Sequence, residues 1–213
     1  MNSKIQTIKD WLGTGSINCL GPPFSGKDTQ AKRISDLLNG VVVSGGDILR
    51  HAKDNTELQK IMAEGGIIPS ELFLSIIPPF FAHQDIANKP LLLSSVGRLT
   101  EEVSTVVSAT NASGHTIKAV VVLDLHEEDV WRHFTISQDL HDRGQRADDT
   151  QDALKTRLAE YAKTAPVIEY YAQHNLVLHI DDTKTVDEVT QEIIDALYEF
   201  ATRAYAFGAG ESI

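Results

Sequence analysis

The chain has 213 residues and carries 19 Lys and Arg against 30 Asp and Glu, which gives a formal net charge of -11. This charge argues against a general binder of nucleic acid or of an acidic membrane, because both are polyanions. A small phosphate ligand needs only a local cluster of cations. No apolar run approaches the ~20 residues of a membrane span, and the one cysteine, Cys19, cannot form an internal disulfide, so we expect a protein of the reducing cytosol.

Five short apolar runs are expected to form strands, after a short helix within residues 1–16. These runs are Ile17–Leu20, Val41–Val43, Pro90–Leu93, Ile117–Leu123 and Leu176–Ile180. They are nearly continuous in β-branched and leucine residues, which is typical of strands buried on both faces of a parallel sheet. Helical patterns separate them, among them Asp28–Leu38, a helix from Gln151 to about Pro166, and Val186–Tyr205. The sequence therefore predicts one α/β domain of three layers with a five-stranded parallel sheet.

A glycine-rich loop joins the first strand to the helix that follows it. The loop has the spacing of two glycines separated by four residues and followed by lysine. Backbone N–H groups in such a loop curl around phosphates, the helix N-terminus adds positive potential, and the lysine reaches the outer phosphates. We predict that ATP phosphates bind at Gly21, Pro22, Ser25, Gly26, Lys27, Asp28 and Thr29.

From Ile17 to Leu197 the chain resembles adenylate kinases and their UMP/CMP kinase relatives. Residues 21–30 are similar to that family's loop Gly-x-Pro-Gly-x-Gly-Lys-Gly-Thr-Gln, and further similar segments follow in the family's order. These are residues 44–50, 66–71, 92–98, 146–149, 157–161 and 180–183. The resemblance implies the three-layer P-loop fold, with a helical acceptor subdomain at about 44–74 and a lid at about 133–146. This lid is short and contains no cysteine, so no zinc is expected.

The resemblance also implies an activity, the reversible transfer of a phosphoryl group from Mg-ATP to a nucleoside monophosphate, with AMP favoured, by a monomer. Arginines are suited to this reaction because their planar, permanently charged groups can hold several phosphates. The residues implied to stabilise the transferring phosphates are Lys27, Arg132, Arg143, Arg146 and Arg157, with Arg132 also on the ATP side. The acceptor nucleotide would contact Gly45, Arg50, Ile68, Arg98, Glu102, Arg146 and Arg157.

Two departures from the family pattern concern the metal. Ser94 stands where the family has an aspartate that helps to hold the water shell of Mg²⁺, and Asp28 stands where the phosphate loop has glycine. We hypothesise that Asp28 replaces the missing carboxylate, with Thr29 beside it and with Asp124 as a second candidate. The alternative for Asp28 is a residue that only offsets the dipole of its helix.

Three further departures leave the acceptor base and the turnover open. Glu102 stands where adenylate kinases carry a glutamine, and Gly45 replaces a threonine. An ionised glutamate only accepts hydrogen bonds, which suits guanine or the amino group of cytosine, although Glu102 could also be a solvated helix residue. Ile136 stands in place of a lid arginine. The alternatives are thus a kinase for CMP, UMP or GMP, and a pseudokinase that binds nucleotides without turnover.

Overall fold

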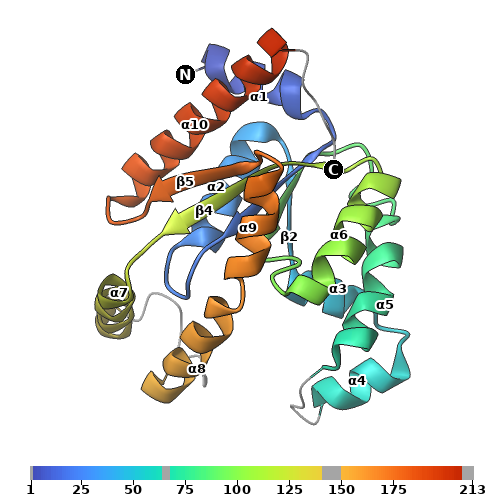
Figure 1. The fold of residues 1–213 in the computed structure, drawn as a ribbon. Coiled ribbons are helices and arrows are strands. Elements are labelled where there is room, and N and C mark those ends of the chain that lie inside the picture. Colours follow the sequence, from blue (N-terminus) through green and yellow to red (C-terminus); the bar gives the residue numbers. More distant parts are fainter. Residues whose placement is uncertain (1, 64–67, 141–149, 208–213) are drawn as a thin grey trace.

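The computed structural model describes residues 2–63, 68–140 and 150–207, and within them it confirms the predicted α/β fold. Five parallel strands form one sheet in the order β2-β3-β1-β4-β5 (Figure 1). The strands are β1 (Ser16–Leu20), β2 (Val41–Ser44), β3 (Leu91–Ser94), β4 (Ile117–Asp124) and β5 (Val177–Asp181). In the centre of the sheet, Ile17 is in register with Leu92 on one side and with Ala119 on the other.

Ten helices of the described residues surround the sheet. They are α1 (Asn2–Leu12), α2 (Lys27–Leu38), α3 (Gly45–His51), α4 (Thr56–Ala63), α5 (Ser70–Phe81), α6 (Thr100–Ala112), α7 (Glu127–Leu140), α8 (Gln151–Ala162), α9 (Ala165–Gln173) and α10 (Val186–Phe207). Figure 1 shows α1 and α10 together on one side of the sheet and α5 and α6 on the other. The fold therefore has three layers.

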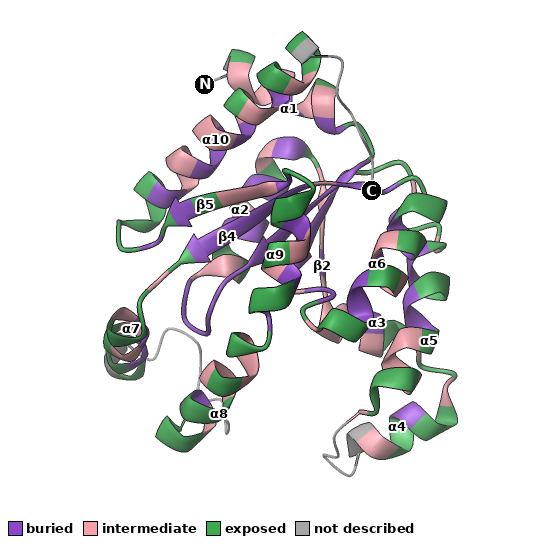
Figure 2. Cartoon of the chain, viewed as in Figure 1, coloured by how far each residue is buried: buried purple, intermediate pink, exposed green. Residues whose placement is uncertain are grey.

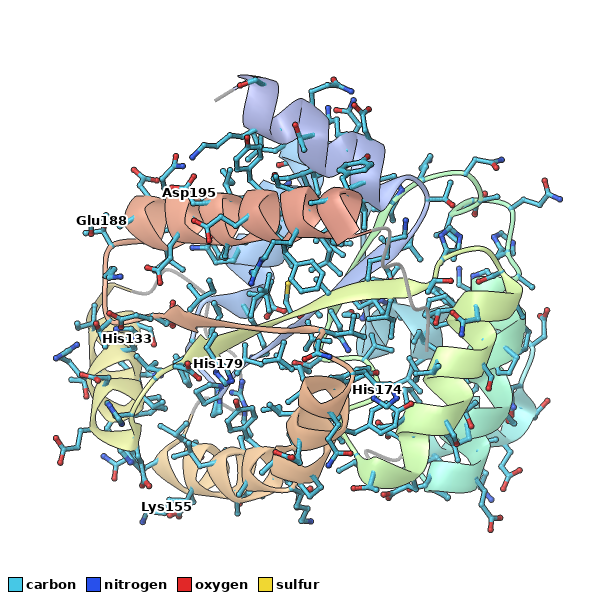
Figure 3. All side chains as sticks on the ribbon, turned by 45° about the horizontal axis from the view of Figure 1, so that its top comes forward. His133, Lys155, His174, His179, Glu188 and Asp195 are labelled. Carbon is cyan, nitrogen blue, oxygen red and sulfur yellow. The ribbon has the colours of Figure 1, made fainter. Side chains whose placement is uncertain are left out.

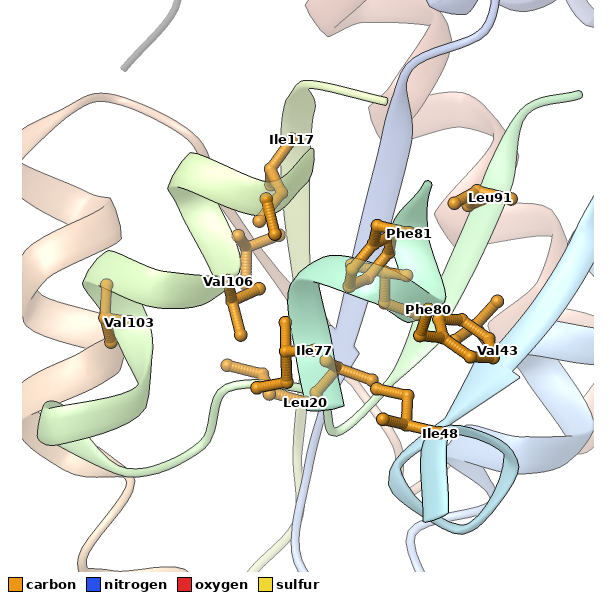
Figure 4. Packing of buried hydrophobic residues seen from close by; sticks show 14 of the residues in the cluster. Leu20, Val43, Ile48, Ile77, Phe80, Phe81, Leu91, Val103, Val106 and Ile117 are labelled. Carbon is orange, nitrogen blue, oxygen red and sulfur yellow. The ribbon is translucent and has the colours of Figure 1, made fainter. Parts of the chain in front are cut away.

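The two faces of the sheet are covered by two separate hydrophobic clusters. Successive strand residues point to opposite faces, so Leu92 joins the cluster beneath α1, α2 and α10, whereas Leu91 and Leu93 join the cluster beneath α5, α6 and α9. Figure 4 shows the second cluster, in which Ile77 and Phe81 of α5 pack near β1 and β3. Figure 2 shows the central strands β1, β3 and β4 mostly buried, whereas the edge strands β2 and β5 are only partly buried and the helices are exposed on their outer sides. This burial on both faces explains the continuous apolar runs of the sequence.

One predicted helix is wrong in its extent. The helix that begins at Gln151 was expected to reach about Pro166, but α8 ends at Ala162 and a separate helix, α9, begins at Ala165. Proline has no N–H group and its ring clashes with the preceding helical turn, so it is tolerated in the first turn of a helix and disfavoured in its interior. Pro166 accordingly lies in the first turn of α9.

The segment that is expected to bind the acceptor nucleotide contains two whole helices and the start of a third. Residues 44–74 cover α3, α4 and the beginning of α5, apart from residues 64–67, which lie outside the described part of the chain. The helix α3 has a complete capping box, because the Ser44 hydroxyl accepts a hydrogen bond from the Asp47 N–H (3.2 Å) and the Asp47 carboxylate accepts one from the Ser44 N–H (2.8 Å). This box fixes where the chain turns from β2 into α3.

Candidate active site

The loop between β1 and α2 is buried and tightly folded at the carboxyl end of the sheet. Gly26 has φ of 66°, in the left-handed region that favours glycine. At Gly21, a β-carbon would lie only 2.6 Å from the Ser25 hydroxyl, so a side chain does not fit there. The Lys27 ammonium donates to the carbonyl of Pro22 at 3.3 Å. The predicted phosphate loop therefore has the compact shape that lets backbone N–H groups face a ligand.

A first cavity, of about 290 Å³, lies on one side of this loop, and we call it the outer cavity. The loop and α2 contribute one wall, the segment between β5 and α10 contributes another, and α7 contributes a third. Its lining includes Ser25, Gly26, Thr29, His133, Ile136, Asp182 and Lys184. The Ser25 hydroxyl is buried and has no hydrogen-bond partner among the described residues. A buried hydroxyl without a partner costs free energy, so a polar ligand that hydrogen-bonds to Ser25 would be favoured at this wall.

Asp182 is a buried acid in the outer cavity, with 7% of its surface exposed. Burial raises the pKa of Asp182 to about 7; the negative charge of Asp181 adds to the rise, and Lys27 opposes it. The sequence prediction did not name Asp182 as a site residue, although residues 180–183 were among the segments that resemble the family. The second aspartate of that segment was the available signal.

A second cavity, of about 120 Å³, lies on the other side of the loop, and we call it the inner cavity. It brings together Lys27 of α2, Arg98 after β3 and Arg157 of α8, three of the predicted phosphate-binding cations. Tyr161 and Thr164 complete one wall, and the Thr164 hydroxyl is buried with no hydrogen-bond partner among the described residues. Burial, followed by the charge of Asp124, raises the pKa of Tyr161 to about 12. Three cations and one carboxylate, that of Glu160, line this space, so its formal net charge is positive and favours an anion.

The two residues that depart from the family's metal pattern are in direct contact. The Ser94 hydroxyl, at the end of β3, donates to the Asp28 carboxylate at 2.5 Å across 66 positions of sequence. Asp28 lies in the first turn of α2, where its charge also opposes the helix dipole. The Asp28 carboxylate of α2 therefore lies beside the end of β3, where the resemblance places the family's aspartate.

The structure does not bring all predicted cations to the inner cavity. Arg50 pairs with Asp47 at 2.7 Å and lines a third cavity, of about 300 Å³, together with His51 and His83. Arg132 is exposed on α7 and pairs with Asp129 at 2.9 Å. Arg143 and Arg146 lie outside the described residues.

The remaining predicted residues have local roles. Glu102 is buried at the start of α6, where its carboxylate accepts a hydrogen bond from the Leu99 N–H at 3.3 Å, so it is not a solvated residue. Burial is the main cause of the raised pKa of Glu102. Gly45 begins α3, and a β-carbon there would only touch the Phe73 ring at 3.9 Å. Ile68 is half-buried and packs against the cluster beneath α5.

Asp124 ends β4 and hydrogen-bonds to a ring nitrogen of His179 at 2.9 Å. Figure 3 labels His179 on β5 and also His133 on α7, which hydrogen-bonds to the phosphate loop at the carbonyl of Phe24 (3.2 Å). Within the described residues, no group of three or more His, Cys, Asp or Glu side chains could hold a metal ion by itself.

Comparison with known proteins agrees with this geometry. The family model described as "Adenylate kinase" matches residues 19–176. The adenylate kinase of Micrococcus luteus is 32% identical over 185 residues, which cover 84% of this chain and 88% of that protein. That of Kocuria rhizophila is 33% identical over 185 residues (84% and 96%), and that of Methanosarcina barkeri is 31% identical over 215 residues (87% and 100%).

None of the described helices is long and apolar enough to cross a bilayer.

The adenylate kinase family model covers all the residues that line the inner cavity, and it extends from β1 to the residue before β5. The chain belongs to the adenylate kinase family.

Proposed function

We propose that this member of the adenylate kinase family catalyses the reversible reaction ATP + AMP = 2 ADP, with Mg²⁺ bound to the donor nucleotide. The observation that carries the proposal is the inner cavity, in which Lys27, Arg98 and Arg157 meet beside the phosphate loop. Phosphoryl transfer needs little covalent help from a protein, because positioning and the stabilisation of negative charge account for most of the catalysis. Three cations in one small cavity meet both needs.

In this proposal each wall of the site has its own part. The donor phosphates bind the backbone of the phosphate loop, where Lys27 exchanges the Pro22 carbonyl for a phosphate oxygen. Arg98 holds the acceptor phosphate and Arg157 stabilises the phosphoryl group during transfer. Arg50 joins the acceptor site when it exchanges its Asp47 partner for the acceptor phosphate. Arg132, Arg143 and Arg146 also stabilise the transferring phosphates in this proposal, and the last two lie outside the described residues.

The contact between Ser94 and Asp28 supports the proposed place of Mg²⁺. Magnesium in kinases is held by one or two carboxylates together with substrate phosphates and water, which agrees with the absence of a larger ligand cluster among the described residues. Asp28 would hold the metal or its water shell, with Thr29 next to it and Asp124 as a more distant candidate. The bound ion would neutralise charge on the donor phosphates.

A charge exchange tests this metal assignment. Asp28→Gly should raise the Mg²⁺ concentration needed for half-maximal rate by about tenfold or more, as is usual for residues that orient a metal. In that background, Ser94→Asp should restore much of the loss, because it returns a carboxylate to the same place from β3. If Asp28→Gly leaves the Mg²⁺-dependent rate unchanged, Asp28 only offsets the dipole of α2.

A coupled assay tests the activity itself. ADP formation should be measured with Mg-ATP and each of AMP, CMP, UMP and GMP, and AMP should give the highest kcat/KM. A preference for GMP or CMP would instead support the interpretation of Glu102 as a base-reading residue. Tight nucleotide binding without ADP formation would support a pseudokinase. The departures from the family pattern at Ser94 and Ile136 are the reason for considering this alternative.

We also propose that the protein acts as a monomer in the cytosol. The large hydrophobic side chains exposed among the described residues are Ile136, Val186 and Tyr205. They come from two different helices, and scattered residues of this kind do not form an interface. Sedimentation velocity at micromolar concentration should give a single species of about the chain's 23.4 kDa.

A further inference from the structure

Phe24 has an unusual backbone conformation for its residue type. It lies in the phosphate loop with φ of 62°, in the left-handed region that favours glycine. A residue with a side chain keeps such a conformation only where its surroundings hold it there, and such residues gather at functional sites. The Phe24 side chain is buried, with 5% of the residue exposed. The contacts of the ring must therefore be what holds the backbone.

These contacts come from α7, whose residues 133–140 belong to the expected lid, and from α8. The Phe24 ring meets the Phe134 ring of α7 edge to face, with 5.4 Å between centroids and 87° between planes. The Arg157 guanidinium of α8 lies over the Phe24 ring, 5.5 Å from its centroid. The carbonyl of Phe24 hydrogen-bonds to His133 of α7 at 3.2 Å. One loop residue thus joins the phosphate loop to both helices.

A small hydrophobic cluster surrounds these contacts. Its buried members are Phe24, Val130, Phe134 and Leu154, and Leu125, Trp131 and Leu158 pack against it. The cluster is separate from the two clusters that cover the sheet. Among the described residues, Phe24 is the member that the phosphate loop contributes. Phe24 is therefore what the phosphate loop contributes to the hydrophobic packing of α7 and α8.

We propose that Phe24 is a positioning residue for Arg157 and fixes α7 and α8 to the phosphate loop before any nucleotide binds. The ring attracts the charge of the guanidinium and does not accept its N–H hydrogen bonds in the way that a carboxylate would. Arg157 is thereby held beside Lys27 and Arg98 in the inner cavity. The part of this proposal that concerns catalysis rests on the proposed function, in which Arg157 contacts the transferring phosphoryl group.

Three substitutions at residue 24 separate the ring from the packing. Phe24→Leu keeps an apolar side chain in the cluster and removes the aromatic face, whereas Phe24→Gly removes the side chain and relieves the backbone. A cation–π contact of this kind corresponds to about a five- to thirtyfold change in rate, so we expect kcat to fall by that factor in both variants. In Phe24→Leu the fall in kcat should exceed any rise in the KM for ATP, because the contact with Arg157 acts on the phosphoryl group in transit, although Phe24 also lines the outer cavity. Phe24→Tyr keeps the face and should retain most of kcat.

A double-mutant cycle and a matched control complete the kinetic test. In an Arg157→Ala background, Phe24→Leu should lower kcat much less than in the wild type, because the residue that it positions is absent. Phe200 provides the control, since it contacts Trp11 edge to face at 5.6 Å and lies under Arg203 at 6.0 Å, on α10. Phe200→Leu removes the same kind of contact away from both cavities and should leave kcat unchanged.

Hydrogen exchange of the full-length protein without nucleotide gives a readout that does not depend on turnover. Phe24→Leu and Phe24→Gly should increase exchange in α7 and α8, and Phe200→Leu should not. Wild-type kcat and exchange in Phe24→Leu would overturn the proposal. It would also be overturned if the loss of activity equals the unfolded fraction seen in denaturation, which indicates a purely structural role. If the wild type shows no turnover, the proposed function fails, and the exchange data alone decide the role of Phe24.

Discussion

Replacing Asp182 with asparagine should change how the stability of the protein depends on pH. Burial is the main cause that raises the pKa of this carboxyl from its ordinary 3.8 to about 7, and the charge of Asp181 adds to it. The folded protein therefore binds this proton more tightly than the unfolded chain does. The stability that the proton contributes is fully present below about pH 4, where both states hold it, and is lost as the pH rises towards about 7.

The size of the effect follows from the difference between the two pKa values. At 1.36 kcal/mol per pKa unit, the difference between 3.8 and about 7 corresponds to about 4 kcal/mol. Because Asp182 borders an open cavity, water screens part of this energy, and we expect a loss of about 2 kcal/mol between pH 5 and pH 8. Asparagine has a similar shape and no charge to bury, so the variant should not show this loss.

Urea unfolding between pH 5 and pH 8.5 measures the effect. The free energy of unfolding at each pH is obtained by linear extrapolation, and the value for Asp182→Asn minus that for the wild type is plotted against pH. This difference should rise up to about pH 7 and then become constant. Taking the difference removes the contributions of the other titrating groups that the two proteins share. Asp54→Asn, an exposed aspartate between α3 and α4, controls for the change in net charge.

A difference that does not vary with pH would refute this reasoning, because it would mean that the carboxyl has the same pKa in the folded and unfolded states. A difference that falls with pH would show that a positive partner, such as Lys27, outweighs burial. Repeating the series with saturating ATP would show whether the nucleotide alters the pKa of Asp182, since both lie at the phosphate loop in the proposed complex.

Three further outcomes are expected from the structure. Burial raises the pKa of the Cys19 thiol to about 12, so a thiol reagent at pH 8 should modify it only as fast as the protein unfolds, and rapid stoichiometric modification would contradict its place in β1. Thr150→Ala should destabilise the protein by about 1 kcal/mol, because the Thr150 hydroxyl caps α8 at the Ala153 N–H (3.2 Å); Thr150→Ser should retain most of that stability in urea unfolding. Burial raises the pKa of Glu102, so the stability of Glu102→Gln relative to the wild type should increase as the pH rises. A difference in stability that is constant with pH would assign the effect to the hydrogen bond from Leu99.

The sequence predicted the elements well where the signal was local. The strands and the last helix lie within about two residues of their predicted bounds, because burial on both faces of a sheet and the period of a helix both act on neighbouring residues. The break at residues 163–164 was missed because a proline can equally end one helix or begin the next. Which of the two occurs depends on how α9 packs on the sheet, and α9 contacts both α6 and β5.

The site was predictable only in part, for a related reason. The spacing of Gly26 and Lys27 identified the phosphate loop, since that motif folds on its own backbone. The sequence also placed Arg98 and Arg157 in the site, and the inner cavity brings both to Lys27. It could not show that Arg50 pairs with Asp47 in a different cavity, because the direction of a long exposed side chain depends on its neighbours in space.

The sequence by itself determined the succession of strands and helices along the chain, the phosphate loop and the kinds of side chain that surround this loop. Only the tertiary structure decided that Ser94 donates to Asp28, that the Arg157 guanidinium lies over the Phe24 ring and that Asp182 is buried with a raised pKa. Each of the first two joins residues more than 60 positions apart, and the third depends on the walls of a cavity built from several elements. Periodicity and spacing describe neighbours along the chain, whereas burial and contact are properties of neighbours in space.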